Sequence, residues 1–409
     1  MKPIKITVFG DIMVEAPFFK QAKKEAGFDF DTPFSHLSHL LADSDAVIGN
    51  LETPLGGECK GYVEDCFSFN SPDVLAASLQ KLGFVYFSTA NNHCLDRGME
   101  GLCRTLDVLD SLGIGHTGTY RNPTWEPKAG CLSVGGLKIA IVAYTYGTNF
   151  TNNGVWLGDK ERCVDLLMPQ GAPSRIRTPP PHEGQADFGA AVSFVERIAG
   201  RPLSMEEKQT YKRIMHLSTV TVDDVVRSDV LDPYLARMEA DIQEAKQKAD
   251  LVLALLHTGG QFNTSPGSYS LYVVEKAVHA GADAVLCAHS HTIQPGVMRS
   301  DTPCFYSLGN VSMYPVGDYL DMNCLPEYGM AVHLYLTDKK IQKVTFSLFK
   351  MYLENGDMAV VPVDVLLERM KDRREREELI RDVNGLCRRI TGKTFPTVDR
   401  EFEFFKEKE

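Results

Sequence analysis

The chain has 409 residues, of which 44% are hydrophobic and 24% charged, and these fractions are typical of a globular protein. With 43 Lys and Arg against 54 Asp and Glu, the formal net charge is −11, which argues against nucleic acid or an anionic membrane surface as the main partner. No stretch reaches the roughly 18 consecutive apolar residues of a membrane-spanning helix, so we expect no integral membrane segment.

The N-terminus and the cysteines both favour a cytoplasmic protein. The first apolar run, residues 4–9, is too short for a secretion signal and is typical of a buried strand. The ten cysteines are scattered without a Cys-x-x-Cys pair, which suits reduced thiols better than a disulfide framework. Pairing of Cys59 with Cys66 across a loop is the alternative that the spacing leaves open.

Short apolar runs alternate with helical patterns along most of the chain. Strands are expected at residues 4–9, 46–48, 84–88, 138–144, 251–256, 284–287, 304–307 and 330–336. Helices are expected at residues 72–82, 98–112, 235–249 and 270–280. This alternation predicts a layered α/β fold.

Two segments depart from the alternation. Residues 156–232 hold a Pro-rich stretch and a polar helical pattern, and we interpret them as an insertion that covers or frames the site. The chain is rich in Arg, Lys and Glu from Asp364 on, which predicts a helical C-terminal appendage with a solvated face at residues 351–409. We therefore assign residues 1–350 to one domain with an insertion at 156–232, and residues 351–409 to the appendage.

Polar side chains follow five of the expected strands at the point where each strand ends. In chain order they are Asp11, Asn50, Glu52, Asn92, His93, His257, His289 and His291. Parallel α/β sheets bind ligands outside the carboxyl ends of their strands, so we expect these side chains to meet at one rim.

The mixture of side chains at this rim points to metal ions. Carboxylate, carboxamide and imidazole together suit a borderline divalent cation such as Mn, Fe or Zn. A carboxylate can bridge two cations, and two metals about 3.5–4 Å apart can activate water and clamp a phosphoryl oxygen. The pattern therefore predicts a dinuclear site. Each residue also has an ordinary alternative: Asp11 as a helix cap, Glu52 as a solvated turn carboxylate, and the histidines as core or loop residues.

Four motifs make the chain resemble a known family. They are Gly-Asp-Ile-Met at 10–13, Gly-Asn-Leu-Glu at 49–52, Ala-Asn-Asn-His-x-x-Asp-x-Gly at 90–98 and Tyr-Ser-Leu-Gly-Asn at 306–310. They are similar to motifs of the CapA-like family, which is linked to poly-γ-glutamate capsule synthesis and belongs to the calcineurin-like metallophosphoesterase superfamily. The resemblance covers residues 4–150 and 245–350 and implies a four-layered α/β/β/α sandwich, with two facing sheets flanked by helices.

The resemblance also implies a role for each rim residue. The implied ligands are Asp11 and His291 on one metal, Glu52 as the bridging carboxylate, and Asn92, His257 and His289 on the second metal. His93 matches the histidine that contacts the phosphoryl oxygen or protonates the leaving group. Asp96 would orient this histidine by accepting its other N–H.

Weaker candidates for contact with the substrate are Arg97, Asn50, Tyr306 and Asn310. Arg97 can grip an anionic group with two hydrogen bonds, and a surface ion pair is its alternative. Asn50 can instead fix the loop that carries Glu52. Met13 stands where the superfamily has a histidine, so one metal would have one nitrogen ligand fewer.

Functions of different classes remain open at this stage. We favour a hydrolase of phosphate esters that uses two divalent metal ions (Mn, Fe or Zn) and metal-activated water, with an anionic small molecule or polymer as substrate. The alternative is a component of poly-γ-glutamate capsule biosynthesis that binds polymer or a partner without phosphatase activity. An amide or peptide hydrolase using the same metals is a third possibility. The sequence determines neither the substrate nor the oligomeric state.

Overall fold

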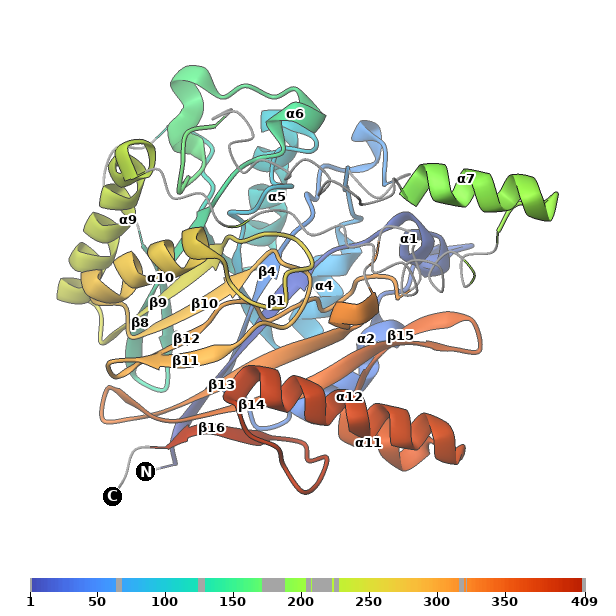
Figure 1. Cartoon of the computed structure of the whole chain (residues 1–409). Helices are drawn as coiled ribbons and strands as arrows, with labels where there is room; N and C mark the ends of the chain where they lie inside the picture. The colour runs from blue at the N-terminus through green and yellow to red at the C-terminus, as the bar shows by residue number, and fades with distance from the viewer. Residues whose placement is uncertain are drawn as a thin grey trace.

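Two β-sheets form the centre of the structure, a computed structural model that describes residues 2–63, 68–123, 129–170, 188–203, 207, 223, 228–315, 320 and 322–406. The two sheets face each other, and helices lie against the outer face of each (Figure 1). The fold is therefore the α/β sandwich that the sequence predicts.

The larger sheet contains the N-terminal strands. Its strands are β1 (Ile4–Ile12), β4 (Ala46–Leu51), β5 (Phe84–Ser88), β6 (Gly115–Thr117), β13 (Tyr328–Thr337), β14 (Lys340–Glu354), β15 (Asp357–Pro362) and β16 (Phe402–Lys406). Their order is β15-β14-β13-β1-β4-β5-β6, and β16 pairs with β14. Because β1, β4, β5 and β6 run parallel, the carboxyl ends of β1, β4 and β5 reach the same edge of the sheet.

The smaller sheet supplies the other half of the rim. Its strands are β7 (Gly130–Val134), β8 (Leu137–Thr145), β9 (Leu251–His257), β10 (Ala284–Ala288), β11 (Gly296–Arg299) and β12 (Thr302–Phe305), in the order β11-β12-β10-β9-β8-β7. Strands β8, β9, β10 and β12 are parallel, so the residues that follow β8, β9 and β10 share one edge. A separate two-stranded ribbon pairs β2 (Lys23–Lys24) with β3 (Gly27–Phe28).

Helices cover both outer faces. In the part of the chain that the structure describes, the helices of eight or more residues are α4 (Val74–Lys81), α5 (Gly98–Ser111), α7 (Phe188–Ala199), α9 (Ser228–Lys248), α10 (Ser268–Ala280) and α12 (Arg373–Thr391). The shorter helices are α1 (Ala16–Ala22), α2 (Asp31–Phe34), α3 (Ser38–Leu41), α6 (Phe150–Asn153) and α11 (Val363–Arg369). Short 3-10 turns lie at Ser35–Leu37, Glu58–Lys60, Gly158–Cys163 and Met322–Cys324.

Side-chain alternation along the strands builds the core. On β9, Leu253 packs between the two sheets, whereas Val252 and Ala254 pack toward α9 and α10. A strand buried on both faces needs apolar residues at every position, which explains the continuous apolar run in the sequence. On β1, Val8 lies in the core between the sheets and Phe9 in the core on the outer face of the larger sheet.

Most predicted elements are confirmed, with small shifts at their ends. Each of the eight expected strands overlaps an observed strand, although β12 begins and ends two residues earlier than expected. The four expected helices correspond to α4, α5, α9 and α10. Strands β14 and β16, whose apolar pattern is broken by polar residues, were not predicted, and neither were β15 and the short strands β2, β3, β6, β7 and β11.

The chain beyond residue 350 is helical in part and also joins the larger sheet. Strands β15 and β16 pair with β14, and Leu379, Val383 and Leu386 of α12 are buried in the same core as the sheet residues. The assignment of residues 351–409 as a separate appendage stays a prediction. So does the insertion at 156–232, most of which lies outside the described residues.

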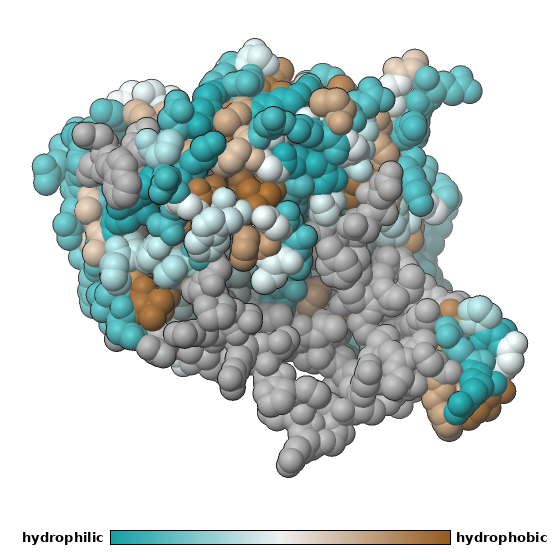
Figure 2. Space-filling model, turned by 90° about the horizontal axis from the view of Figure 1, so that it is seen from above, coloured by the Kyte–Doolittle hydropathy of each residue, from teal (hydrophilic) through white to brown (hydrophobic). Residues whose placement is uncertain are grey.

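Helix α7 extends away from the two sheets (Figure 1), and the view from above shows hydrophilic and hydrophobic surface on it (Figure 2). Within the described residues, no helix combines the length and apolar character needed to cross a membrane. The nine cysteines in this part of the chain, Cys59 among them, are free thiols. Cys66 lies outside the described residues, so its pairing is not tested.

Candidate metal centre

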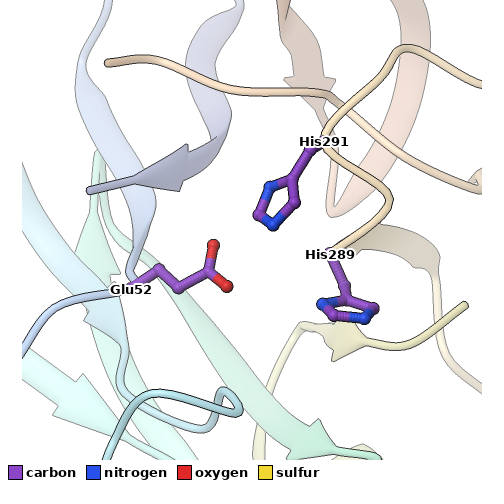
Figure 3. A group of neighbouring side chains, drawn as sticks. All are labelled: Glu52, His289 and His291. Carbon is purple, nitrogen blue, oxygen red and sulfur yellow. The ribbon is translucent and has the colours of Figure 1, made fainter. Parts of the chain in front are cut away.

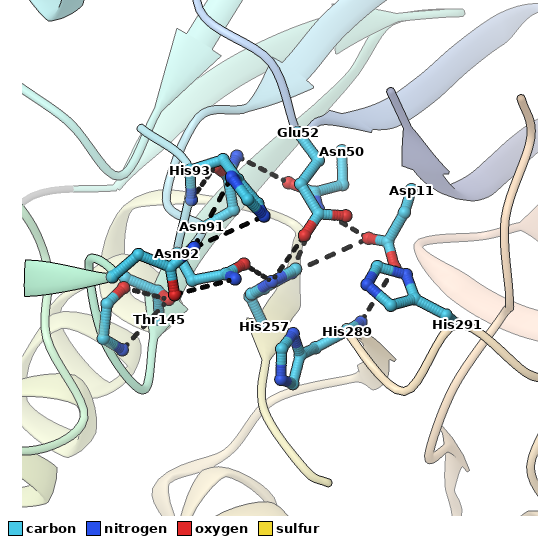
Figure 4. A network of polar contacts seen from close by, with 12 residues as sticks. Asp11, Asn50, Glu52, Asn91, Asn92, His93, Thr145, His257, His289 and His291 are labelled. Carbon is cyan, nitrogen blue, oxygen red and sulfur yellow. Dashed lines mark hydrogen bonds and ion pairs between the residues drawn. The ribbon is translucent and has the colours of Figure 1, made fainter. Parts of the chain in front are cut away.

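Six side chains predicted as metal ligands meet where the carboxyl ends of parallel strands from both sheets come together (Figure 4). The larger sheet contributes Asp11 on β1, Glu52 after β4 and Asn92 after β5. The smaller sheet contributes His257 at the end of β9, and His289 and His291 after β10. All six are buried, with at most 4% of each residue exposed. Residues at strand ends that are far apart in the sequence thus come together in one cluster.

Glu52 belongs to two groups of three side chains that could hold a metal ion. It forms one group with His289 and His291 (Figure 3) and the other with Asp11 and His257. Within each group, one ligand atom per residue lies within 4.8 Å of the others. A carboxylate shared between two such groups has the position that a bridging ligand needs.

The buried polar atoms of this cluster fit divalent cations. Both carboxylate oxygens of Glu52 and the Nδ1 atom of His289 are buried and form no hydrogen bond, although Nε2 of His257 lies 3.3 Å from Oε1 of Glu52. Leaving such groups unpaired away from water costs about 1–3 kcal/mol each, and more for a charged group. Cations between these atoms would use the free lone pairs and offset the desolvation of the carboxylate.

Burial also sets the protonation of the candidate ligands. Desolvation, reinforced by the neighbouring Glu52 carboxylate, raises the pKa of Asp11 to about 7. Desolvation raises the pKa of Glu52 to about 8. For the imidazoles burial acts in the opposite sense and lowers the pKa of His257 to about 4, that of His291 to about 3, and that of His289 well below its ordinary value. Neutral imidazole is the form that binds metals, and a nearby cation would favour the ionised carboxylates.

Asn50 and a backbone amide fix the carboxylate of Asp11. The Nδ2 atom of Asn50 donates to Oδ1 of Asp11 over 2.7 Å, and the backbone N–H of His289 donates to Oδ2 over 2.9 Å. Asn50 Nδ2 also lies 3.1 Å from Nδ1 of His257. Asn50 therefore contacts candidate ligands from both sheets.

The loop that carries His289 and His291 has an unusual backbone. Both residues have positive φ, 102° and 54°, which costs energy for residues other than glycine. Asn310 holds the loop from the neighbouring segment: its Oδ1 lies 2.9 Å from Nδ1 of His291, and its Nδ2 donates to the carbonyl oxygen of His291 over 2.9 Å. Asn310, predicted as a weak candidate for substrate contact, thus lies against the centre.

His93 lies beside the ligand cluster and is paired with Asp96. Its Nδ1 atom is 2.6 Å from Oδ2 of Asp96, and the same oxygen accepts the backbone N–H of Phe69 over 2.7 Å. Burial alone would lower the pKa of His93, but the hydrogen bond and charge of Asp96, together with Glu52 and Asp11, raise it overall. The pair has the geometry expected of an oriented imidazole.

The two remaining candidates lie apart from the ligands. Arg97 donates to the carbonyl oxygens of Gly61 and Asp96, over 3.1 and 2.9 Å, and so braces the turn that follows His93. Tyr306 packs in the core between the smaller sheet and its helices, where Arg299 donates to its hydroxyl over 3.2 Å. The structure does not bring Tyr306 to the cluster.

Two further residues at the centre were missed from the sequence. The ring centroid of Tyr146 lies 4.4 Å from that of His289, and Asn149 contacts Asn92 and His93. Both follow the strand expected at residues 138–144. The rule that ligands lie after parallel strands could have found them, but their residue types are less specific for metal binding than carboxylates and histidines.

Comparison with known proteins gives consistent matches. Residues 5–314 match the family model described as bacterial capsule synthesis protein PGA_cap. The protein y4sH of Sinorhizobium fredii is 24% identical over 292 residues, covering 68% of this chain and 60% of the relative. Capsule biosynthesis protein CapA of Bacillus anthracis is 23% identical over 310 residues, covering 75% of this chain and 59% of the relative.

A second Bacillus protein matches to the same degree. PGA biosynthesis protein CapA of Bacillus subtilis is 23% identical over 312 residues, covering 74% of this chain and 61% of the relative. The matches therefore span about three-fifths of the length of these curated relatives.

Proposed function

The chain belongs to the bacterial capsule synthesis family PGA_cap, which is the CapA-like family of the metallophosphoesterase superfamily, and from this membership and the buried centre we propose that it is a metal-dependent hydrolase of phosphate esters. The observation that carries the proposal is the carboxylate of Glu52. It is fully buried, forms no hydrogen bond through either oxygen, has Nε2 of His257 3.3 Å from Oε1, and is common to both groups of candidate ligands.

Two divalent ions, Mn, Fe or Zn, would supply an activated water and would neutralise charge on the phosphoryl oxygens. The residues that would hold them are Asp11, Glu52, Asn92, His257, His289 and His291. The division of these ligands between two ions stays a prediction. The resemblance pairs Asp11 with His291, whereas the two groups of three join Asp11 with His257 and His289 with His291. Nδ1 of His257 and Nδ1 of His291 each lie 3.6 Å from the carboxylate of Asp11.

The protein's own groups would bind and orient the ester and move a proton. Because Asp96 engages Nδ1 of His93, the Nε2 atom is left to hold the proton that the leaving oxygen needs. The raised pKa of His93 favours the protonated ring that such an acid requires. Burial of the surrounding side chains strengthens their electrostatic contacts with an anionic substrate.

Metal content and hydrolysis together test the proposal. Protein purified without chelator or metal-affinity resin is expected to contain about two Mn, Fe or Zn per chain and to hydrolyse a phosphate monoester or diester from a panel. His93→Asn should retain the metals and lose about 10²–10⁴-fold in kcat, the range of general acid catalysis. His279→Asn, at an exposed histidine on α10, is the matched control. A chain that binds no metal after incubation with each cation would refute the hydrolase.

A role in capsule polymer synthesis without hydrolysis is the second candidate. It is favoured by the names of the Bacillus relatives, which refer to capsule and PGA biosynthesis. The net charge of −11 opposes binding of an anionic polymer, so retention on poly-γ-glutamate in competing salt would be specific. Retention without hydrolysis of any phosphate ester would favour this candidate over the first.

The free cysteines support a reducing compartment such as the cytoplasm for either function.

A further inference from the structure

Asn149 and the residues that its side chain contacts at the candidate centre come from different sheets. It follows β8 of the smaller sheet, whereas Asn92 and His93 follow β5 of the larger sheet. Its Oδ1 atom accepts a hydrogen bond from Nδ2 of Asn92 over 3.2 Å. Its Nδ2 atom lies 3.4 Å from Nε2 and 3.5 Å from Nδ1 of His93.

The contact with Asn92 decides which end of that side chain faces the cluster. A carboxamide carries an oxygen with lone pairs at one end and an NH₂ donor at the other, and only the oxygen can bind a cation. Because the Nδ2 atom of Asn92 donates to Asn149, its Oδ1 atom is directed to the other side. There it lies 2.7 Å from Nε2 of His257, inside the ligand cluster.

We propose that Asn149 is a positioning residue that fixes the carboxamide of Asn92 with its oxygen toward the metal centre. The inference rests on the metal site of the proposed function and is independent of phosphate-ester hydrolysis. A free carboxamide can turn either its oxygen or its NH₂ group toward the ions, so a neighbouring residue is needed to hold it in one orientation.

Hydrogen bonds tie together the loop that carries Asn149. Gln170 joins its two ends: Nε2 donates to Oγ1 of Thr148 over 2.7 Å and to the carbonyl oxygen of Val155 over 2.8 Å, and Oε1 accepts the N–H of Leu157 over 2.7 Å. Asn149 itself has φ of 50°, a conformation that asparagine, aspartate and glycine tolerate. The contacts of Gln170 hold the chain on both sides of Asn149, and the side chain itself contacts Asn92 and His93.

Binding of Mn²⁺ to chelator-treated protein, followed by calorimetry, tests the inference without any enzyme assay. Asn149→Gly removes both side-chain contacts and keeps the backbone conformation available, so it should weaken one Mn²⁺ site by about 10- to 100-fold. Asn149→Asp should keep the affinity of the unaltered chain, because a carboxylate accepts the same hydrogen bond from Asn92. Asn152→Gly, in the exposed part of α6, is the matched control and should have no effect.

A second background separates orientation from general loosening of the site. Both oxygens of a carboxylate can bind a cation, so in Asn92→Asp the ligand needs no orientation by Asn149. Adding Asn149→Gly to Asn92→Asp should therefore leave the Mn²⁺ affinity unchanged, whereas the same change in the native background weakens it. An equal loss in both backgrounds, or no loss in either, would overturn the inference.

The outcomes also distinguish this inference from the proposed function. If the unaltered chain binds Mn²⁺ but hydrolyses no phosphate ester, the function fails and the calorimetric comparison still tests Asn149. If hydrolysis occurs and Asn149→Gly binds Mn²⁺ normally, only the inference fails. A chain that binds none of Mn²⁺, Fe²⁺ and Zn²⁺ overturns both.

Discussion

The guanidinium of Arg389 donates a hydrogen bond over 3.1 Å to the carbonyl oxygen of Ile293, two residues after the predicted ligand His291. The same group donates to Oγ1 of Thr292 over 3.3 Å and to the carbonyl oxygen of Cys324 over 2.9 Å. Arg389 lies on α12, beyond the residues 5–314 that match the family model. The C-terminal helix thus supports the loop that presents two of the candidate ligands.

We expect loss of this support to weaken metal binding. Arg389→Met keeps much of the apolar stem but removes the donors, so the loop with positive φ at His289 and His291 would relax. The expected result is a loss of about tenfold in Mn²⁺ affinity, measured by calorimetry. Arg388→Met, at an exposed neighbour on the same helix, is the control. Equal affinity in the two variants would show that Arg389 contributes only to packing.

Replacement of Glu52 should separate metal binding from stability. Glu52→Gln replaces one carboxylate oxygen by an NH₂ donor, so the side chain can no longer bridge two cations. We expect metal stoichiometry to fall to one ion or none per chain and hydrolysis to be lost, as measured by elemental analysis and ester turnover. The exposed Glu58→Gln provides the matched control.

The same variant should be more stable than the unaltered chain when both lack metal. The glutamine removes a buried carboxyl group whose pKa burial raises to about 8, so ionisation at higher pH no longer costs stability. Thermal unfolding of the two chelator-treated proteins at pH 8.5 checks this. A lower melting temperature for Glu52→Gln would argue that Glu52 is stabilised by contacts other than a cation.

Without metal, the stability of the folded protein should fall as pH rises from about 7 to about 8. In the metal-free protein the pKa of Asp11 is about 7, and those of Glu52 and Glu15 are about 8, all above their ordinary values. Between about pH 7 and pH 8 the folded chain then holds more protons than the unfolded chain, so its stability should fall as pH rises through this range. Below about pH 6.5 the buried histidines with lowered pKa act in the opposite sense. Mn²⁺ displaces the protons of its ligands, so its stabilising effect should be larger at pH 8 than at pH 5.5.

Glu15 provides an internal comparison for that measurement. It is buried, but it accepts the backbone N–H of Tyr314 and belongs to neither group of candidate ligands. Glu15→Gln should therefore reduce the pH slope of the metal-free protein without changing the increment that Mn²⁺ adds. A stability that stays flat or rises between pH 7 and pH 8 in the metal-free chain would contradict the raised pKa values.

The fold and the clustering of the candidate ligands were largely predictable because both follow from local patterns. The apolar run of β9 implies burial on both faces, and ligands after parallel strands imply a shared rim. What failed depended on tertiary packing. Tyr306 follows β12, where Phe305 lies in the core between the sheets, so the next side chain faces the helices instead of the rim.

Supporting contacts carried little local signal: only the position of Asn149 after an expected strand pointed to the rim. Asn149 and Arg389 contact residues 57 and 96 positions away in the chain, and neither lies in a motif. Their partners are set by how the two sheets and α12 are placed, which periodicity does not encode. The roles assigned to the individual ligands stay predictions for a related reason: the sequence brings them to one rim without fixing how they divide between ions.

The His93–Asp96 pair gives the prediction most specific to phosphate-ester hydrolysis. The 2.6 Å contact between Nδ1 and Oδ2 holds the ring and raises the pKa of His93, and the N–H of Phe69 holds the carboxylate in turn. Asp96→Asn should lower kcat about 10- to 100-fold with two metals retained and KM little changed.

The pH profile distinguishes this role from a structural one. An imidazolium that protonates the leaving group is active only below its pKa, and Asp96→Asn removes a cause of the raised pKa of His93. The alkaline fall in kcat should therefore move to lower pH in Asp96→Asn. Asp110→Asn breaks a comparable pair at the surface, where Asp110 lies 3.1 Å from His116, and should leave the profile unchanged. An Asp96→Asn profile that keeps its shape and position while kcat falls would assign Asp96 to holding the turn and would remove His93 as the proton donor.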